Sequence, residues 1–278
     1  MKIRILGTRG SLPSTNPETF RYGGNTSCIE VSNDDQFFII DAGTGVLKIS
    51  PELISNQNRF DILLTHLHID HIQGLGFFKP LFDPKNEIHI WGPSSSSRTL
   101  QNRLNRYLSP PLFPVHFRSL PCQKELHEIS RSSFELCGLQ IETAYVSHPG
   151  PTVGYRITDG DFVFTYLPDH EPFLGNRGWN YGKKWISGMG LAYKADLIIH
   201  DSQYTLEEYP DKIGWGHSSI EQAIRYAGIA EAKKLLLFHH DPNHTDSQLD
   251  FILRSYSGFT PEGLEVEHAV EGSVYNLR

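Results

Sequence analysis

The sequence predicts an α/β fold, because strand-like runs recur along its 278 residues and amphipathic helical patterns follow several of them. These runs are short, apolar and rich in β-branched or aromatic residues. Several of them end in a histidine or an aspartate. In α/β sheets, functional side chains gather in the loops at the carboxyl ends of strands. The pattern therefore predicts a site at one edge of the sheet.

The N-terminal third is predicted to consist mainly of strands, at residues 2–6, 27–31, 37–40 and 60–64. A glycine-containing loop, residues 7–13, follows the first strand, and a second one, residues 23–27, precedes the next. Backbone amides in such loops can approach an oxyanion closely. A plain turn is the simpler explanation for either loop taken alone.

The stretch from residue 79 to residue 135 has the weakest pattern. Residues 94–107 are predicted to be helical. The three prolines within residues 109–114 exclude a regular element there, since proline fixes φ and removes a hydrogen-bond donor. We expect this stretch to cover the site and to shape the substrate pocket.

Two helices are predicted in the C-terminal third, each beginning with a capping-box pattern. Residues 218–221 are Ser-Ser-Ile-Glu, and residues 245–248 are Thr-Asp-Ser-Gln. Apolar residues follow at helical spacing, at Ile220, Ala223, Ile224 and Ala227 in the first helix and at Leu249, Ile252, Leu253 and Tyr256 in the second. These stripes are expected to face the core.

Composition and charge limit the classes of function. The formal net charge of -7 argues against a large basic surface for long nucleic acids, although a local basic patch is compatible with it. We find no apolar run long enough for a signal peptide or a membrane helix. The scattered cysteines, Cys28, Cys122 and Cys137, favour a reduced cytoplasm over a disulfide framework. Because no low-complexity linker interrupts the chain, residues 1–278 are predicted to form a single domain.

The strongest local signal is the segment of residues 65–71, Thr-His-Leu-His-Ile-Asp-His, which directly follows a predicted strand. Imidazole and carboxylate are ligands that zinc, manganese and iron accept. In an extended segment His66 and His68 point to the same side, while Asp70 and His71 lie at the turn into a helix. One short segment could therefore supply ligands to two adjacent metal ions. A solvated polar turn is the alternative.

This segment resembles the HxHxDH signature of the metallo-β-lactamase superfamily, whose fold is an αββα sandwich of two mixed β-sheets flanked by helices. The resemblance implies that His66 and His68, with a later histidine, hold one metal ion. Asp70 and His71, with another late histidine, would hold the second. A bridging carboxylate completes the site in many hydrolytic members. The sandwich would fill most of the length of this chain.

The later ligands implied by the resemblance occur in chain order, each after a strand-like run. His148 is expected to be the third ligand of the first ion, and Asp169 the bridging carboxylate. His239 is expected to be the late ligand of the second ion because it directly ends its strand, whereas His240 would point to the opposite face. Asp41 resembles the aspartate that orients such ligands from beneath, although an Asx-turn before glycines explains it equally well.

Two further segments resemble the tRNA 3′-processing endonuclease branch of the superfamily. His217, within Gly-Trp-Gly-His-Ser-Ser, matches a histidine that contacts the scissile phosphate, and Asp201 stands where that branch has a glutamate partnering it. The resemblance implies that Asp201 orients His217, which stabilises the phosphorane or protonates the leaving oxygen. Asp70 is assigned to catalysis as well as to metal binding. The alternative is that His217 merely packs beside Trp215 at a helix cap.

The resemblance to that branch does not extend to its tRNA-binding arm. In members whose own chain contains the arm, it lies between the third histidine and the bridging aspartate. Here only residues 149–168 separate His148 from Asp169, and they contain two strand-like runs and a turn at 159–161. With the acidic net charge, this favours a small phosphodiester, such as a cyclic nucleotide, over long nucleic acid. We therefore predict a phosphoric diester hydrolase with two divalent metal ions sharing a hydroxide, zinc first, manganese or iron otherwise.

Other functions fit the same motif. A lactonase or thioesterase of this fold would attack a carbonyl carbon and need a polarising group, for which Tyr204 is a candidate. A non-catalytic metal-binding module is disfavoured, because structural zinc sites are usually closed by four protein ligands. A diiron oxygen reductase of this fold generally has a glutamate where His68 stands and needs a flavin domain. The protein is expected to be cytoplasmic, with no membrane partner, and the resemblance leans toward a homodimer.

Overall fold

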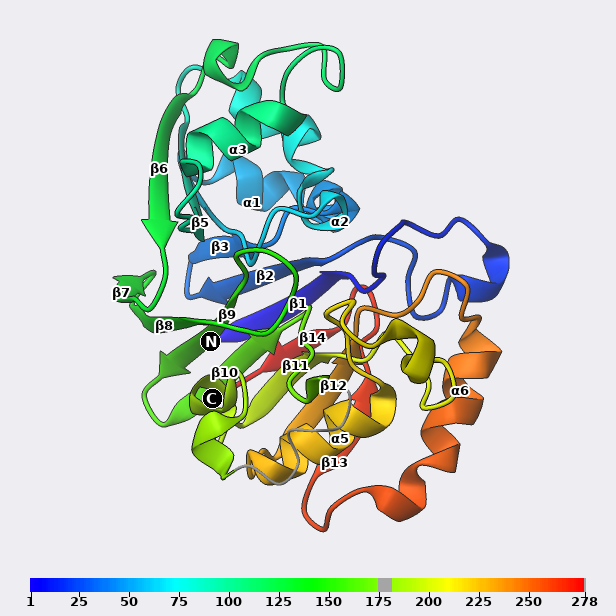
Figure 1. Cartoon of the computed structure of the whole chain (residues 1–278). Coiled ribbons are helices and arrows are strands. Elements are labelled where there is room, and N and C mark those ends of the chain that lie inside the picture. The colour runs from blue at the N-terminus through cyan, green and yellow to red at the C-terminus, as the bar shows by residue number, and fades with distance from the viewer. Residues whose placement is uncertain (175–181, 278) are drawn as a thin grey trace.

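The computed structural model describes residues 1–174 and 182–277, which form two seven-stranded sheets packed face to face with helices on the outer faces (Figure 1). This confirms the predicted α/β fold with two mixed sheets. The strands are β1 (Lys2–Gly7), β2 (Cys28–Asn33), β3 (Gln36–Ile40), β4 (Arg59–Leu63), β5 (Glu87–Pro93), β6 (Gln123–Ile129), β7 (Ser133–Leu136), β8 (Leu139–Tyr145), β9 (Val153–Asp159), β10 (Phe162–Leu167), β11 (Leu197–Asp201), β12 (Lys234–Phe238), β13 (Glu265–His268) and β14 (Val274–Asn276). The α-helices are α1 (Pro51–Ser55), α2 (Ile69–Ile72), α3 (Leu100–Tyr107), α4 (Met189–Ala192), α5 (Ile220–Ile229) and α6 (Asp246–Ser255).

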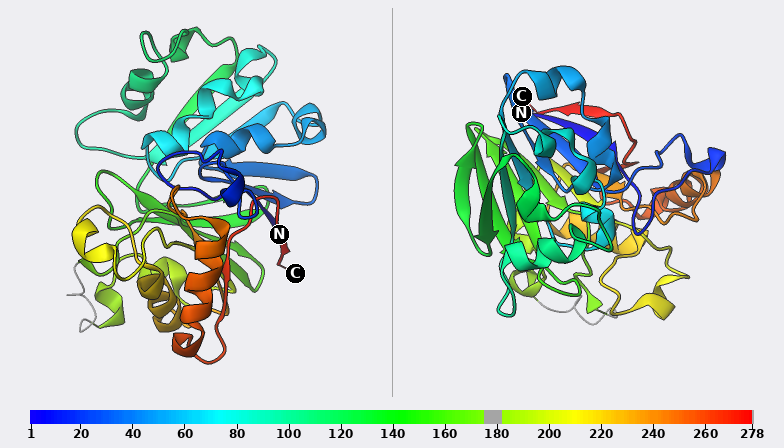
Figure 2. Two further views of the ribbon diagram at one scale, coloured as in Figure 1. Left: turned by 90° about the vertical axis from the view of Figure 1, so that its right-hand side faces the viewer. Right: turned by 90° about the horizontal axis from the view of Figure 1, so that it is seen from above.

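The two sheets have related topologies. The first sheet has the order β14-β1-β2-β3-β4-β5-β6 and the second β13-β12-β11-β10-β9-β8-β7. In the first sheet the strands from β3 to β6 are parallel, and in the second those from β10 to β13. The left view of Figure 2 shows the N-terminal half of the chain above the C-terminal half. The parallel strands of both halves end at a shared edge, since the residues that follow β4, β10 and β12 lie close together.

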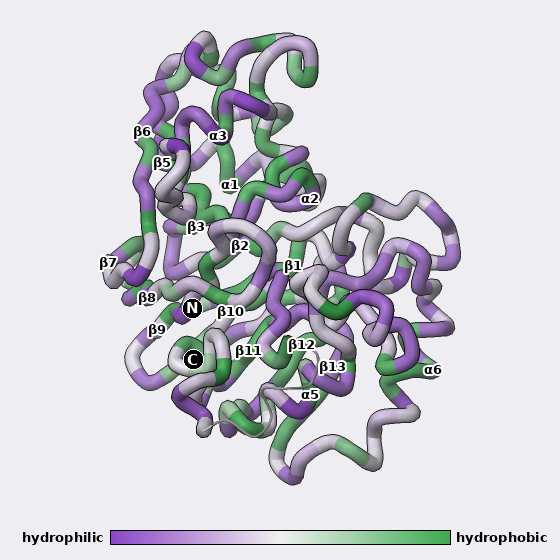
Figure 3. Tube along the Cα trace, in the orientation of Figure 1, coloured by the Kyte–Doolittle hydropathy of each residue, from purple (hydrophilic) through white to green (hydrophobic). Residues whose placement is uncertain are grey.

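Three apolar layers hold the sandwich together. The layer between the sheets contains alternate residues of both, such as Ile5, Val31, Tyr155 and Leu236, all fully buried. A second layer lies between the first sheet and α1–α3, and a third between the second sheet and α4 and α5. The central strands are mostly hydrophobic, because both faces of each sheet are buried (Figure 3). The flanking helices have mixed hydropathy, because only one face of each helix is buried.

Several element boundaries differ from the predicted ones. The helix predicted at residues 94–107 begins only at Leu100, because the side chain of Thr99 caps it by accepting from the amide of Asn102. The first predicted capping box lies one residue later, between Ser219 and Gln222. Ser218 cannot cap the helix because its hydroxyl donates to the carbonyl of His170 at 2.6 Å. The second box, at Thr245, is confirmed.

The predicted strands of the N-terminal third are confirmed to within a residue or two, as is the lack of a helix or strand at residues 109–114. Within the described ranges, no helix combines the length and hydrophobicity needed to cross a membrane.

Candidate metal centre

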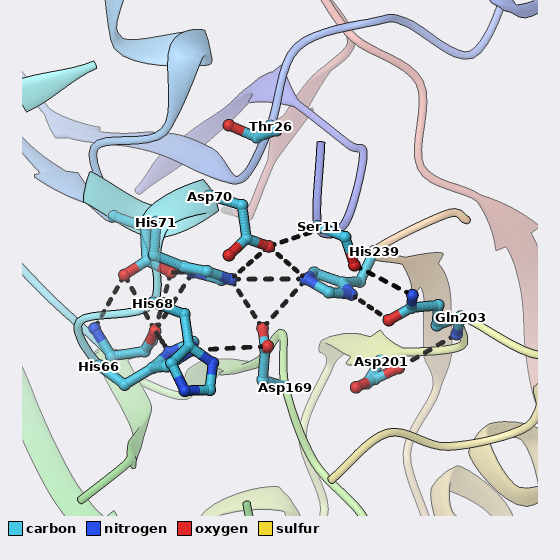
Figure 4. A network of polar contacts seen from close by, with 12 residues as sticks. Ser11, Thr26, His66, His68, Asp70, His71, Asp169, Asp201, Gln203 and His239 are labelled. Carbon is cyan, nitrogen blue, oxygen red and sulfur yellow. Dashed lines mark hydrogen bonds and ion pairs between the residues drawn. The ribbon is translucent and has the colours of Figure 1, made fainter. Parts of the chain in front are cut away.

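The predicted ligand residues meet at the carboxyl ends of four strands. His66, His68, Asp70 and His71 follow β4, and His148, Asp169 and His239 follow β8, β10 and β12, respectively. These seven residues form two groups of potential metal ligands whose ligand atoms lie within 4.8 Å of one another in each group. Figure 4 shows the carboxylate of Asp169 between the two groups. The fold therefore brings together all seven residues that were predicted to be metal ligands.

The first group contains His66, His68, His148 and Asp169. His148 Nε2 lies 3.1 Å from His68 Nδ1. Asp169 Oδ2 lies 3.6 Å from both His66 Nε2 and His148 Nε2. Two nitrogens bound to one tetrahedral zinc at about 2.0–2.1 Å stand roughly 3.3 Å apart, so these separations suit a shared ion.

The second group contains Asp70, His71 and His239, with the other oxygen of Asp169 facing it. His239 Nε2 lies 3.1 Å from Asp70 Oδ2 and 3.4 Å from Asp169 Oδ1. His71 Nε2 lies 2.9 Å from Asp169 Oδ1. Asp169 thus presents Oδ2 to one group and Oδ1 to the other, which is the geometry of a bridging carboxylate.

Four of the histidines are oriented through the ring nitrogen that faces away from the centre. Such outer contacts fix the tautomer and leave the inner lone pair available to a metal ion. The outer contacts are His66 Nδ1 with Thr65 Oγ1 at 3.1 Å, His71 Nδ1 with Asp41 Oδ2 at 2.8 Å, His148 Nδ1 with the Gly216 carbonyl at 2.8 Å, and His239 Nδ1 with Gln203 Oε1 at 3.1 Å.

Two inner atoms support the fit of this set of residues to cations. Among the described residues, the buried atoms His66 Nε2 and Asp169 Oδ1 have no hydrogen-bond partner. His71 Nε2 approaches Asp169 Oδ1 at 2.9 Å. Buried nitrogen lone pairs and carboxylate oxygens repel one another unless a positive charge lies between them. These residues therefore fit two divalent ions.

Burial keeps most of the imidazoles neutral, the form that binds metals. It lowers the pKa of His148 to about 4 and also lowers the pKa of His68. Burial, with the neighbouring His71, holds the pKa of His66 well below its usual value. Although burial disfavours its charge, the imidazoles around Asp169, His239 first, hold the pKa of that carboxyl well below its usual range.

His71 differs from the other imidazoles. Burial opposes its charge, but the carboxylates of Asp169, Asp41 and Asp70 raise the pKa of His71 well above its usual value. A proton and a metal ion compete for the same lone pair at Nε2. Metal binding is therefore expected to release this proton and to weaken as the pH falls.

Asp41 orients the ligands from beneath the site. Its carboxylate accepts hydrogen bonds from the amide of Thr65 at 2.8 Å, from the Thr65 hydroxyl at 2.9 Å and from His71 at 2.8 Å. The Tyr166 hydroxyl also donates to it, at 3.2 Å. Asp41 and His239 both have left-handed backbones, with φ of 59° and 61°. Such non-glycine residues cost about 1–3 kcal/mol each and concentrate at functional sites.

His217 and Asp201 form a close pair beside the centre. Asp201 Oδ2 lies 2.7 Å from His217 Nδ1, and Asp169 Oδ2 lies 3.9 Å from the same atom. The ring of His217 stacks on that of His239 at 4.9 Å. Burial disfavours the charged ring, but the charge and hydrogen bond of Asp201 raise the pKa of His217 to about 9. His217 does not cap α5, because Ser219 does, and Trp215 is mostly exposed.

The loop at residues 7–13 borders the centre. The Ser11 amide donates to Asp70 Oδ2 at 2.7 Å, so a backbone amide does approach a carboxylate here. Gly10 lies against His239, and a Cβ at this position would stand 2.2 Å from His239 Nδ1. The loop at residues 23–27 has another partner, since the amides of Gly24 and Asn25 both donate to Glu271 at 3.1 Å.

Two other buried residues near the centre, Arg9 and Glu171, were not predicted. Arg9 donates to four backbone carbonyls, those of Thr19, Gly23, Asp241 and His244, and so fastens the 7–13 loop to the segment after β12. Glu171 accepts from the amides of Gly214 at 3.0 Å and Gly216 at 2.9 Å, and from the Tyr209 hydroxyl. Neither residue belongs to a motif, and both act on loops distant in sequence.

Glu171→Gln is expected to lower turnover or metal affinity by roughly 10–100-fold, the usual effect of losing an outer contact. The reason is that Gly216 carries the carbonyl that holds His148 and directly precedes His217. Steady-state kinetics and metal analysis of the purified variant measure the effect. The exposed Glu262→Gln serves as the matched control. Unchanged kinetics and metal content would show that the loop does not need Glu171.

His239→Ala is expected to lose metal affinity, whereas His240→Ala should keep the centre and lose stability instead. His240 lies on the opposite face, where its Nε2 contacts the Ala269 carbonyl at 3.1 Å and its ring packs near Tyr22. Removing this buried contact should cost about 1–3 kcal/mol of unfolding free energy. Metal content and thermal unfolding of the two variants separate these effects, and the reverse result would exchange the assignments.

The chain is similar in sequence and in fold to several known proteins. A family model described as a beta-lactamase superfamily domain matches residues 36–240. Ribonuclease Z of Thermococcus gammatolerans is 24% identical over 286 residues, which cover 88% of this chain and 85% of that protein. The structure of human tRNase Z, short form, superposes with a TM-score of 0.69 at 20% identity over 100% of both chains. A diphosphatase from the PhnP family superposes with a TM-score of 0.66 at 17% identity, over 99% of this chain and 96% of the other.

Proposed function

Since the chain belongs to the metallo-β-lactamase superfamily, we propose that it is a metal-dependent hydrolase that cleaves small phosphodiesters, with cyclic nucleotides as the leading class. The observation that carries this proposal is the position of Asp169, whose two carboxylate oxygens face two separate groups of ligands with the His217–Asp201 pair alongside. Two groups of metal ligands, with His217 available beside them, suit a site for phosphoryl transfer.

The two groups would hold two divalent ions, zinc first and manganese or iron otherwise. His66, His68 and His148 would hold the first, Asp70, His71 and His239 the second, and Asp169 would bridge them. When bound, the ions would supply an ionised water at neutral pH and stabilise negative charge on the phosphoryl oxygens. The chain itself orients the ligands, buries the site and supplies the remaining proton.

His217 would supply that proton. Its Nδ1 donates to Asp201, which leaves Nε2 available to face a substrate. As an imidazolium, His217 would stabilise the charge that develops on phosphorus and then protonate the leaving oxygen. Asp201 would act by orienting this ring and by favouring its charged form.

The segment between His148 and Asp169 supports a small substrate. Residues 149–168 consist of a short loop, β9, a tight turn at Gly160 and β10, so they carry no appended arm. The comparisons add support for phosphorus chemistry, because similar proteins are named ribonuclease Z, tRNase Z and diphosphatase. The net charge of -7 also favours a small substrate over long nucleic acid.

The test is hydrolysis of bis(p-nitrophenyl) phosphate by metal-stripped protein refilled with zinc or manganese. We expect metal-dependent release of nitrophenol from this diester and none from the monoester. A lactone and a thioester are assayed in parallel. Turnover of either one, with no cleavage of the diester, would overturn the proposal and favour a hydrolase that attacks carbonyl carbon. In that case Tyr204, whose ring lies 6.0 Å from that of His217, is the first residue to substitute.

A further inference from the structure

A second cluster of ligand-type side chains lies outside the metal centre, on β5 and β6 at the end of the first sheet (Figure 1). It consists of His89 on β5 and of Glu125 and His127 on β6, and their ligand atoms lie within 4.8 Å of one another. The strands are parallel neighbours, with His89 paired to Glu125. Residues at every second position share a face, so β6 presents Glu125 and His127 together.

The distances within this cluster lie within about 0.5 Å of those expected around one ion. His89 Nδ1 lies 2.9 Å from His127 Nε2. The Glu125 carboxylate lies 3.7 Å from the former nitrogen and 3.8 Å from the latter. Ligands of one tetrahedral zinc stand roughly 3.3 Å apart. In the metal centre of this same chain, facing histidine nitrogens lie 3.1 Å and 3.4 Å apart.

The tautomer of His89 is set as it is in a metal ligand. Its Nε2 donates to Glu87 Oε1 at 2.8 Å, which leaves the Nδ1 lone pair directed at His127. A carboxylate behind the ligating imidazole is the usual support of such histidines, and Asp41 supports His71 in the same way.

The ring of His127 is also held in place. It stacks on Trp91 at 3.8 Å with an interplanar angle of 15°, and Phe134 stacks on Trp91 at 4.5 Å. The indole of Trp91 is fixed in turn, because its Nε1 donates to Asp61 at 2.9 Å. The His127 ring therefore needs little reorganisation to bind an ion, which favours affinity.

A hydrogen bond between the two imidazoles would explain their 2.9 Å contact without an ion. It would not explain why the Glu125 carboxylate lies almost equally far from both nitrogens, beyond hydrogen-bond distance of either. We propose that His89, Glu125 and His127 form an additional site for one divalent ion of the zinc class, independent of the metal centre. Three protein ligands leave one position for water, and the ion would fasten the edge strand β6 to β5.

The experiment uses Zn²⁺ and Co²⁺ as probes on the full chain. Wild type, His127→Ala and His116→Ala are saturated with Zn²⁺, dialysed, and analysed for bound zinc per chain. His116 is an exposed histidine in the same half of the molecule and controls for loose binding. We expect His127→Ala to bind one ion fewer than wild type and His116→Ala to match wild type. Equal zinc content in all three proteins would overturn the proposal.

A second variant keeps the test decisive if His127→Ala unfolds. Glu125 is mostly exposed, so Glu125→Gln should preserve the fold while weakening the site at least ~10-fold. Repeating the zinc analysis on an Asp169→Ala background separates this site from the metal centre. The intense visible absorption of tetrahedral Co²⁺ should include a component that His127→Ala or Glu125→Gln removes on that background. Identical spectra with and without these substitutions would contradict the assignment, whatever the enzyme hydrolyses.

Discussion

Asp169→Ala is expected to bind at least one metal ion fewer than wild type and to lose at least ~100-fold in phosphodiester turnover, more than an outer contact contributes. The physical reason is that one carboxylate serves both groups, with Oδ1 at 2.9 Å from His71 Nε2 and Oδ2 at 3.6 Å from His148 Nε2. Removing it leaves buried imidazoles without their shared counter-charge. Metal analysis of the purified variant and steady-state kinetics at saturating zinc measure the two losses.

The matched control for this variant is Asp161→Ala, which removes an exposed aspartate from the turn between β9 and β10. It should leave both metal content and turnover unchanged. Loss of activity in Asp169→Ala with an intact far-UV spectrum would support the bridging role. Full metal occupancy together with full activity in Asp169→Ala would contradict the bridging role.

His217→Ala is expected to lower turnover by roughly 10²–10⁴-fold, the contribution of a positioned general acid, while keeping its metal ions. His217 stacks on His239 and lies with Asp169 and His239 in a further group of potential ligands. The two main groups are complete without it, and its Nδ1 is occupied by Asp201 at 2.7 Å. The loss should therefore appear in kcat and not in metal content. His116→Ala, at an exposed position, provides the matched control. A large loss of metal in His217→Ala would mean that this histidine is a ligand.

Asp201→Asn tests the pairing through the pH profile. Burial lowers the pKa of His217, and the Asp201 carboxylate raises it to about 9. Removing the carboxylate charge should therefore lower that pKa. If protonated His217 is the active form, the alkaline limb of kcat/KM should move to lower pH in Asp201→Asn. Bound divalent ions repel the imidazolium and lower the pKa in both proteins, so the comparison between variant and wild type is the informative one. If the alkaline limb lies at the same pH in Asp201→Asn and in wild type, Asp201 does not control the titration that limits activity.

The double variant His217→Ala/Asp201→Asn distinguishes a shared function from two independent ones. If Asp201 acts only through His217, the double variant should lose no more turnover than His217→Ala alone. Asp201 also accepts from the backbone amides of His170 and Gln203, at 3.0 Å and 3.1 Å. A further loss in the double variant would show that these structural contacts matter for activity.

The sequence by itself determined which residues can reach the centre. The resemblance to the metallo-β-lactamase superfamily selected His66, His148, Asp169 and His239. Each of them lies within three residues of the end of a strand, which places it at the carboxyl edge of its sheet. The alternation of an extended chain also predicted that His239 and His240 face opposite sides. The two side chains do diverge, but the backbone of His239 is left-handed, with φ of 61°, and not extended. These predictions depend on backbone geometry over a few residues, which the local sequence specifies.

Only the tertiary structure decided how these residues are supported. Asp41 could equally have been an Asx-turn residue, and its role depends on the pairing of β3 with β4, which brings it to Thr65 and His71. Gln203 contacts the ligand His239, 36 residues away in the chain. Glu171 contacts the loop at Gly216, 45 residues away. The cross-strand cluster of His89, Glu125 and His127 depends in the same way on the register of β5 and β6. Such contacts arise from packing between distant segments, and packing leaves no periodic signal in the chain.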